Sequence, residues 1–336
     1  MTKVLRATTA SKIFAVIGLP TILLLATVPS WADRSTIRKL IELLILISLA
    51  QMWNLLAGFA GVVSVGQQAF VGLAAYSVVA LVNVHGVGLY WAVPLAALGA
   101  ALVSVPMGLV AFRLRGSYFA IGTWVLAEVT RLVMVNTKKV GGGSGASIRV
   151  TGYSIASRDR TFYWMALAVG IGSILLTYGL LRSKLGLQLQ AIRDNEDGAR
   201  SLGANVYRTR FLLWVVVAFM TGFSGAVFYA NQFRVQPGEA FGVSRWTAPI
   251  IFMVIIGGIG TIEGPIIGAI AYWYFKERFS NSPEWYAIAL GLLAMGIALF
   301  VQKGIWGLIR RRFDVHLFPV RRRVAADTGN TDVTGH

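Results

Sequence analysis

Long apolar stretches alternate with short polar segments along almost the whole chain. No stretch alternates apolar and polar residues as a strand of a membrane barrel would. The pattern predicts an all-α polytopic membrane protein with about ten transmembrane helices, some of them broken, and the span count stays open between eight and ten. Runs that could cross a hydrocarbon core of about 30 Å occur at 13–28, 40–81, 89–112, 118–135, 162–181, 211–231, 247–275 and 285–301.

Two of these runs contain glycine-rich breaks. Transporters place substrate at helix breaks, and a break at membrane depth needs protein or a water-filled path beside it. A tight turn between two packed spans is the alternative. The spacings Gly58-x-x-Gly61 and Gly257-x-x-Gly260 fall in similar places in the two halves, which suggests an internal repeat. The candidates for a translocation path are Gly58, Gly61, Ser64, Gly66, Gln67, Gln68, Gly257, Gly258, Gly260, Glu263 and Gly264.

The longest polar, amphipathic segment is 182–210, between two apolar runs. Its apolar residues from Leu189 to Leu202 fit one face of a helix, and Gly203 would end that helix. We therefore expect a surface helix at the mouth of the membrane domain. A plain basic cytoplasmic loop is the alternative, because charged runs are usually solvated.

Charge sets the expected topology. The net charge of +17 comes from basic residues spread over many loops, which favours anionic lipid over nucleic acid as a partner. A break near Gly257 to Pro265 places both termini in the cytoplasm, in line with the positive-inside tendency. We expect a membrane domain over 1–310 and a disordered, basic cytoplasmic tail over 311–336. Residues 1–32 are read as an uncleaved first span, with a cleaved signal peptide as the alternative.

Charged residues also mark two places near the expected outer side. Glu128 and Arg131 lie three apart within a span, and we expect an ion pair that faces the bundle. The outer segment 136–160 has five basic residues against one acid, which would attract an acidic docking surface or favour an anionic or zwitterionic solute. No acid in a span is clearly placed to hold a free ammonium group.

The residues that enzymes need are missing or scattered. There is no cysteine, the three histidines are His85, His316 and His336, and no HExxH occurs. No lysine follows a glycine, so the chain has no nucleotide-binding P-loop. We expect no enzymatic activity, no metal and no cofactor bound by this chain.

Four stretches together resemble the branched-chain amino-acid ABC importer permease family of the LivM type. They are Asn54–Tyr76, Arg113–Val133, 191–210 and Ile255–Ala269, in the family's order. Two places depart from the family pattern: Gln67 and Gln68 stand where Gly-His is frequent, and 138–144 is a basic version of a Thr-Gly-Gly-rich segment. The resemblance assigns contact with the ATPase to Arg193, Asp194, Asn195, Glu196, Asp197, Gly198, Ala199, Leu202 and Gly203.

The resemblance also implies the complex and its location. It implies a multi-pass subunit of the bacterial inner membrane, a related second permease subunit that is identical or different, two cytoplasmic ATPase subunits that bind ATP, and a periplasmic binding protein. Branched-chain amino acids are the expected solute, with urea and aromatic or sulfonated acids as alternatives. A secondary transporter or a channel is the alternative outside this family.

Overall fold

The computed structural model describes residues 4–5, 9–149, 154–279, 288, 291–292, 295–296, 304–313 and 323–324. Two π-helical turns, η1 (Leu55–Phe59) and η2 (Ala80–Val84), extend the second and third helices. The α-helices are α1 (Thr9–Trp31), α2 (Arg34–Asn54), α3 (Gln67–Val79), α4 (Leu89–Ala111), α5 (Ser117–Asn136), α6 (Ile155–Arg182), α7 (Lys184–Asp194), α8 (Glu196–Ser201), α9 (Val206–Gln232), α10 (Pro237–Ala240), α11 (Thr247–Gly257), α12 (Glu263–Arg278) and α14 (Gly304–Phe313).

Six of these helices are long and apolar enough to cross a membrane: α2 with η1, α3 with η2, α4, α5, α6 and α9. The all-α polytopic architecture is therefore as predicted. Two shorter apolar helices are Pro20–Trp31 of α1 and α11, and α12 has 16 residues. The last expected span, 285–301, lies mostly outside the described residues.

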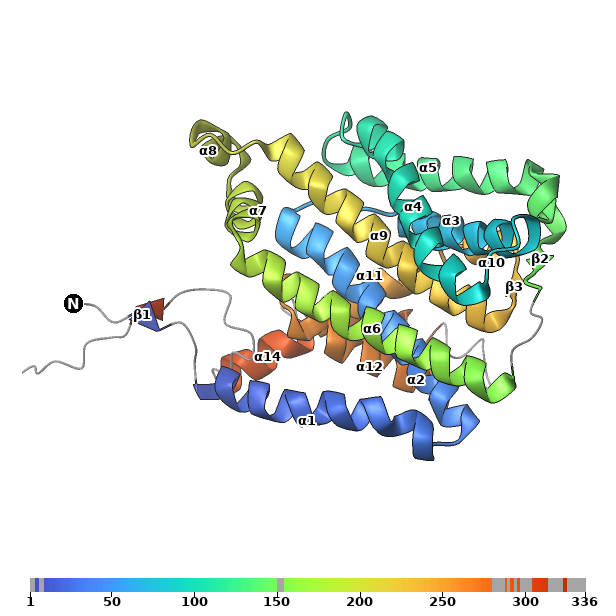
Figure 1. The fold of residues 1–336 in the computed structure, drawn as a ribbon. Coiled ribbons are helices and arrows are strands. Elements are labelled where there is room, and N and C mark those ends of the chain that lie inside the picture. The colour runs from blue at the N-terminus through green and yellow to red at the C-terminus, as the bar shows by residue number, and fades with distance from the viewer. Residues whose placement is uncertain are drawn as a thin grey trace, which may run out of the picture.

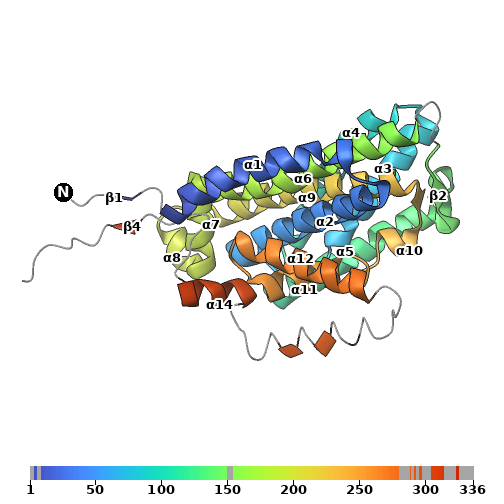
Figure 2. The ribbon, with the colours of Figure 1, turned by 90° about the horizontal axis from the view of Figure 1, so that it is seen from below.

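The helices pack around α2 and α9, which the other helices flank (Figures 1 and 2). Residues 44–57 of α2 and η1 are all buried, including the polar Ser48, Gln51 and Asn54. Trp214 of α9 is 1% exposed, packs edge-on against Phe70 of α3, and donates from Nε1 to the Ser104 carbonyl of α4 at 2.9 Å. Because a buried indole N–H needs an acceptor, this bond fixes α4 against α9.

The start of α2 is capped by its own sequence. Asp33 accepts hydrogen bonds from the backbone of Ser35 at 3.0 Å and Thr36 at 3.2 Å. The hydrogen bonds from the side chain and backbone of Thr36 lower the pKa of Asp33, so the carboxylate stays ionised as a helix cap requires.

The bundle has two distinct ends. In Figure 2, α7, α8 and α14 lie at one end, and α10 and β2 (Ala146–Ser147) lie at the other. We call them the α8 end and the α10 end. A Cβ on Gly304, the first residue of α14, would lie 2.5 Å from the Gly258 Cα, so α14 meets the end of α11 directly.

The outer segment forms a tight structure at the α10 end. The 3-10 turns η3 (Lys138–Val140) and η4 (Gly142–Ser144) lead into β2, which pairs antiparallel with β3 (Arg234–Val235). Gly145 has a φ of 79°, and a Cβ there would strike the Val235 carbonyl. The glycine cluster thus lets the segment lie against the end of α9. A second strand pair joins β1 (Val4–Leu5) to β4 (Arg323–Val324).

Helices α11 and α12 form a hairpin with backbone-to-backbone contact. A Cβ on Gly257 would strike the Gly264 carbonyl, and a Cβ on Gly268 would strike the Met253 carbonyl. Small residues allow this close approach. In lipid no hydrophobic driving force brings helices together, so such close packing is what stabilises their association. The expected break near Gly257 to Pro265 is therefore a turn between two short helices. The expected tail, 311–336, lies mostly outside the described residues.

Candidate functional site

The segment 182–210 folds as two helices, α7 and α8, where we expected one. Asn195 separates them: its backbone is extended and its Oδ1 accepts from the Gly198 N–H at 2.8 Å, so it caps α8. The second helix ends before Gly203, which has a φ of 84°. This ending is as predicted, because glycine readily adopts the left-handed conformation that follows a helix.

The apolar face predicted for this segment holds only in part. Ile192 and Ala199 are buried, and they pack with Val206 in a small core of their own. Leu202, however, is 89% exposed, so the expectation that it shares one helix face with Ile192 and Ala199 was wrong. The turn at Asn195 changes the direction of the chain between Ile192 and Leu202, and spacing in one continuous helix no longer applies. Leu202 is left as an apolar tip at the α8 end.

Two arginines join this segment to the first glycine-rich break. Arg193 donates from Nη1 to the Gly58 carbonyl at 2.7 Å, and Arg210 donates from Nε to the Ala60 carbonyl at 3.2 Å. Both carbonyls belong to the end of the helix formed by α2 and η1, where backbone acceptors lack helical partners. Charged donors make these bonds stronger than neutral ones.

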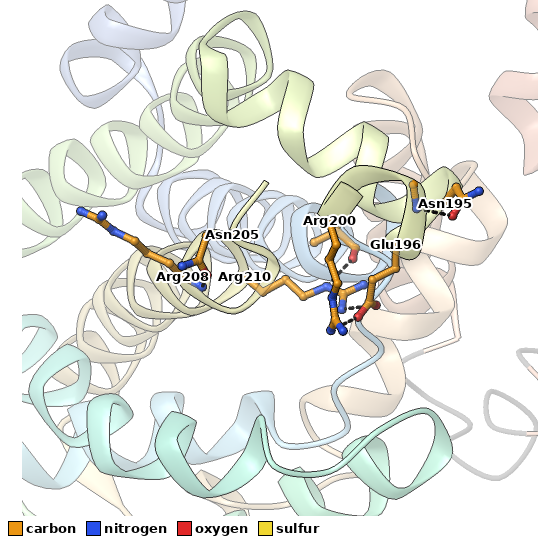
Figure 3. A network of polar contacts seen from close by, with 8 residues as sticks. Asn195, Glu196, Arg200, Asn205, Arg208 and Arg210 are labelled. Atoms are coloured by element: carbon orange, nitrogen blue, oxygen red, sulfur yellow. Dashed lines mark hydrogen bonds and ion pairs between the residues drawn. The ribbon is translucent and has the colours of Figure 1, made fainter. Parts of the chain in front are cut away.

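Glu196 at the start of α8 connects this helix with α9. Arg210 of α9 donates to its Oε2 at 2.7 Å and Arg200 of α8 to its Oε1 at 2.6 Å, as Figure 3 shows. Partial burial would raise the pKa of Glu196, but the hydrogen bond from Arg210 and the charges of Arg210, Arg200 and Arg115 outweigh it and lower the pKa. The carboxylate therefore stays ionised and holds the segment together.

The remaining residues of the predicted contact surface lie around this network. Asp194 has a 60% exposed side chain and pairs with Arg193 at 3.1 Å. Asp197 lies in the first turn of α8, where a negative charge favours the helix. The α8 end thus carries both acidic groups and an exposed leucine.

The two glycine-rich breaks meet in space. A Cβ on Gly58 would lie 2.6 Å from the Gly260 nitrogen, so the two backbones touch. Asn54 completes the contact: its Oδ1 accepts from the Gly260 N–H at 2.8 Å and its Nδ2 donates to the Thr261 carbonyl at 2.8 Å. Gln51, one turn earlier, donates to the Ile262 carbonyl at 2.5 Å. The sequence did not single out Asn54 or Gln51, although polar residues inside an apolar run were the available signal.

Most path candidates are packed inside this chain. Gly257, Gly258, Glu263, Gly264, Ser64 and Gly66 are buried, whereas Gly61 is exposed. Gln67 and Gln68 begin α3 beside Thr221, about halfway along α9, and Thr247, the first residue of α11. The Thr221 hydroxyl donates to Gln67 Oε1 at 3.4 Å, and the Thr247 hydroxyl donates to Gln68 Oε1. Gln67 Nε2 is buried without a hydrogen-bond partner among the described residues.

The first break also touches α5. A Cβ on Gly66 would strike the Thr123 carbonyl, and the Val65 N–H donates to Thr123 Oγ1 at 3.1 Å. Further along α5, Glu128 and Arg131 form the expected ion pair at 2.5 Å. Their side chains are 48% and 30% exposed, so the prediction that the pair faces the bundle was wrong. Spacing along one helix indicates pairing but not which side the neighbouring helices cover.

Comparison with known proteins identifies the family of this chain. Residues 36–301 match the family described as branched-chain amino acid transport system / permease component. The chain is 27% identical to the high-affinity branched-chain amino acid transport system permease protein LivM of Escherichia coli (strain K12), over 84% of this chain and 72% of that protein.

More distant similarity extends to permeases for other solutes. The chain is 26% identical to the fructose import permease protein FrcC of Rhizobium meliloti, over 39% of this chain and 38% of that protein. It is also 26% identical to the autoinducer 2 import system permease protein LsrC of Salmonella paratyphi B, over 41% of this chain and 40% of that protein. With the match over 36–301, most of its length, the chain belongs to the family of branched-chain amino acid transport system permease components.

Proposed function

We propose that this chain is a permease subunit of an ABC importer in the bacterial inner membrane, and that α7 and α8 receive the cytoplasmic ATPase. The observation that carries the proposal is the combination of an exposed tip at Leu202 with charged hydrogen bonds from the same segment to Gly58 and Ala60. A segment built in this way offers a surface to a partner and is joined directly to a transmembrane helix.

The contacts suggest how movement of the segment reaches the membrane. A displacement of α7 would act on Gly58 through Arg193, and Gly58 touches Gly260 of the second break. In the first break, Gly66 and Val65 also contact Thr123 of α5. Two arrangements of these packed elements, biased by ATP on one side and by the loaded binding protein on the other, would give alternating access.

The partners and solute follow from family membership. The complex would contain a second permease subunit, two ATPase subunits and a periplasmic binding protein, and the ATP would be bound by the ATPases. Branched-chain amino acids are the proposed solute, supported by the family match and by the similarity to LivM proteins. The exposed Lys138 and Lys139 at the α10 end suit an acidic surface on the binding protein.

The test replaces Leu202 with arginine. Because Leu202 is 89% exposed, the substitution leaves the packing of the segment unchanged but places a charge at the proposed contact. We expect the chain to insert normally and to lose copurification with the ATPase. The control is Val84→Arg, at a half-exposed position of η2. Equal copurification of both variants with the ATPase would exclude the proposed contact.

The solute is tested on the assembled complex. In proteoliposomes with the cognate binding protein, we expect ATP-driven uptake of leucine and none of urea or of aromatic and sulfonated acids. Uptake of one of the latter in place of leucine would retain the importer and replace its substrate. Uptake of leucine without any ATPase subunit would instead indicate a secondary transporter.

A further inference from the structure

The helix α5 is the least covered of the six spans that the structure describes. Only 17% of the residues in its most apolar stretch are buried, against 39% to 83% in the other five spans. Its buried positions are Phe119, Thr123 and Ala127, which face α3 and the first break. One stripe on the opposite side is open, and its residues are Ile121, Trp124, Val125, Glu128 and Leu132.

This open stripe differs in kind from a surface that faces lipid. Helix α4 also exposes large apolar residues, such as Leu98 and Leu102, but it contains no charged residue over its 23 positions. In α5, Glu128 lies about 16 Å from Ser117 and about 12 Å from Asn136 at the rise of an α-helix, and so near the middle of the span, and Arg131 lies one turn closer to Asn136. A charged side chain at that depth is costly in lipid and normally faces a water-filled cavity or a partner.

The pair leaves donors and acceptors available. Arg131 Nε lies 3.0 Å from both oxygens of Glu128, and Nη2 lies 2.5 Å from Oε1. Within the described residues, Arg131 Nη1 makes no hydrogen bond, and the Glu128 side chain is 48% exposed. A guanidinium can therefore bind a second carboxylate through its free edge, while Glu128 accepts from a cation.

We propose that Glu128 and Arg131 line the translocation path and bind the ammonium and carboxylate groups of a zwitterionic solute as it passes. Ile121, Val125 and Leu132 beside the pair would contact an apolar side chain of that solute. The sequence offered no acid in a span that was clearly placed to bind an ammonium group. The exposed side chain of Glu128 is such an acid in this proposal. This inference rests on the proposed function, since it takes an amino acid as the solute and a second permease subunit as the opposite wall of the path.

The first test removes both charges but keeps the hydrogen-bonding capacity, in the double variant Glu128→Gln and Arg131→Gln. If the ion pair had only a structural role, neutral replacement would be tolerated and the assembled complex in proteoliposomes would keep its uptake. If the pair binds the solute, as we propose, leucine uptake should fall about tenfold or more because charged hydrogen bonds are lost. Subunit copurification should stay normal. The control is Lys39→Gln with Glu277→Gln, which removes the exposed ion pair of 2.5 Å between α2 and α12.

Two results of this test would overturn the proposal. One is unchanged leucine uptake by the double variant. The other is loss of copurification with the second permease subunit, which would make the pair a dry contact between subunits.

The second test uses the absence of cysteine from the chain. Single cysteines at Val125 and Leu132 should react with a water-soluble, charged thiol reagent in membranes that contain the complex. Cysteines at Leu98 and Leu102 of α4 should not react. If all four positions are equally inert, α5 faces lipid or packed protein and the proposal fails.

The two tests separate failure of this inference from failure of the proposed function. If the unmodified complex does not take up leucine, the proposed substrate is wrong, and the zwitterion site fails with it. Thiol labelling would then still decide whether α5 lines a water-filled path.

Discussion

The guanidinium of Arg193 donates to the carbonyl of Gly58 across 135 residues of sequence, over 2.7 Å. The same guanidinium lies close to Gly260, since a Cβ there would be 3.3 Å from Nη1. One side chain from α7 thus reaches both glycine-rich breaks. We infer that this arginine is the shortest connection between the surface segment and the helices that would have to move.

Replacing Arg193 with alanine should uncouple the segment from the membrane helices. A hydrogen bond to a charged group contributes about 1.5–3 kcal/mol, which corresponds to roughly 10- to 100-fold in an equilibrium between two states. We expect ATP-driven uptake to fall by about tenfold or more while ATP hydrolysis continues. The measurement is uptake per ATP hydrolysed in proteoliposomes.

Arg208→Ala is the matched control for this variant. Arg208 lies close to the same network, but its side chain is exposed and points away from Glu196 (Figure 3). It should keep the ratio of uptake to hydrolysis. If the two variants behave alike, the contact of Arg193 with Gly58 has no part in coupling.

Gly58→Ala should destabilise the chain because the added methyl group would meet Asn54 Oδ1 and the Gly260 nitrogen. Overpacking of this kind typically costs about 1–3 kcal/mol. Thermal unfolding in detergent should show a lower Tm. Gly179→Ala in α6 is the control, because nothing lies within 4 Å of the added Cβ, and alanine favours a helix by up to about 1 kcal/mol. An unchanged Tm for Gly58→Ala would mean that the breaks separate easily.

The ion pairs of Glu196 should make a contribution to stability that depends on pH in one direction. The folded pKa of Glu196 is lowered, so this contribution is present above the unfolded pKa of about 4.3 and is lost as the pH falls through the folded pKa. The difference in Tm between the unmodified chain and Glu196→Gln should be constant from about pH 5.5 to 8 and should disappear in stronger acid. A difference that grows on acidification would contradict the assigned shift.

The topology can be tested with reporter fusions. Helix α12 runs from the second break toward Lys39 of α2, which pairs with Glu277, and α14 begins against Gly258 near the α8 end. We therefore expect an outside signal from a fusion after Arg278 and an inside signal from a fusion after Lys303. An outside signal after Lys303 would contradict the topology in which the chain turns back between α11 and α12.

The sequence predicted the six described spans well because apolar length is a strong signal, and the total of about ten helices stays a prediction. The break between α11 and α12 and the helix end before Gly203 were also within reach, since glycine clusters mark both. The division of α7 from α8 was missed, although Asn195 followed by Glu196 and Asp197 is a typical start of a helix. The meeting of Gly58 with Gly260 could not be predicted, because neither periodicity nor composition reports contacts across 202 residues.

The direction of a side chain around its helix was the other property that sequence could not supply. Glu128 and Arg131 form their pair as predicted but Glu128 lies on the uncovered side of α5, and Leu202 points away from the small core that Ile192 and Ala199 share. For Glu128 the answer depends on which neighbouring element covers α5, and for Leu202 it depends on the turn at Asn195. That information lies in the packing of the whole chain.

The backbone contact between α11 and α12 limits how this region can change over evolutionary time. Gly257, Gly264 and Gly268 each lack room for a single added carbon, so substitution by alanine is not tolerated at these positions. Ile255 and Ile270 point outward and can vary freely among apolar residues. Saturation mutagenesis of the hairpin should therefore show that only glycine is tolerated on the face between α11 and α12, whereas many apolar residues are tolerated on the outer face.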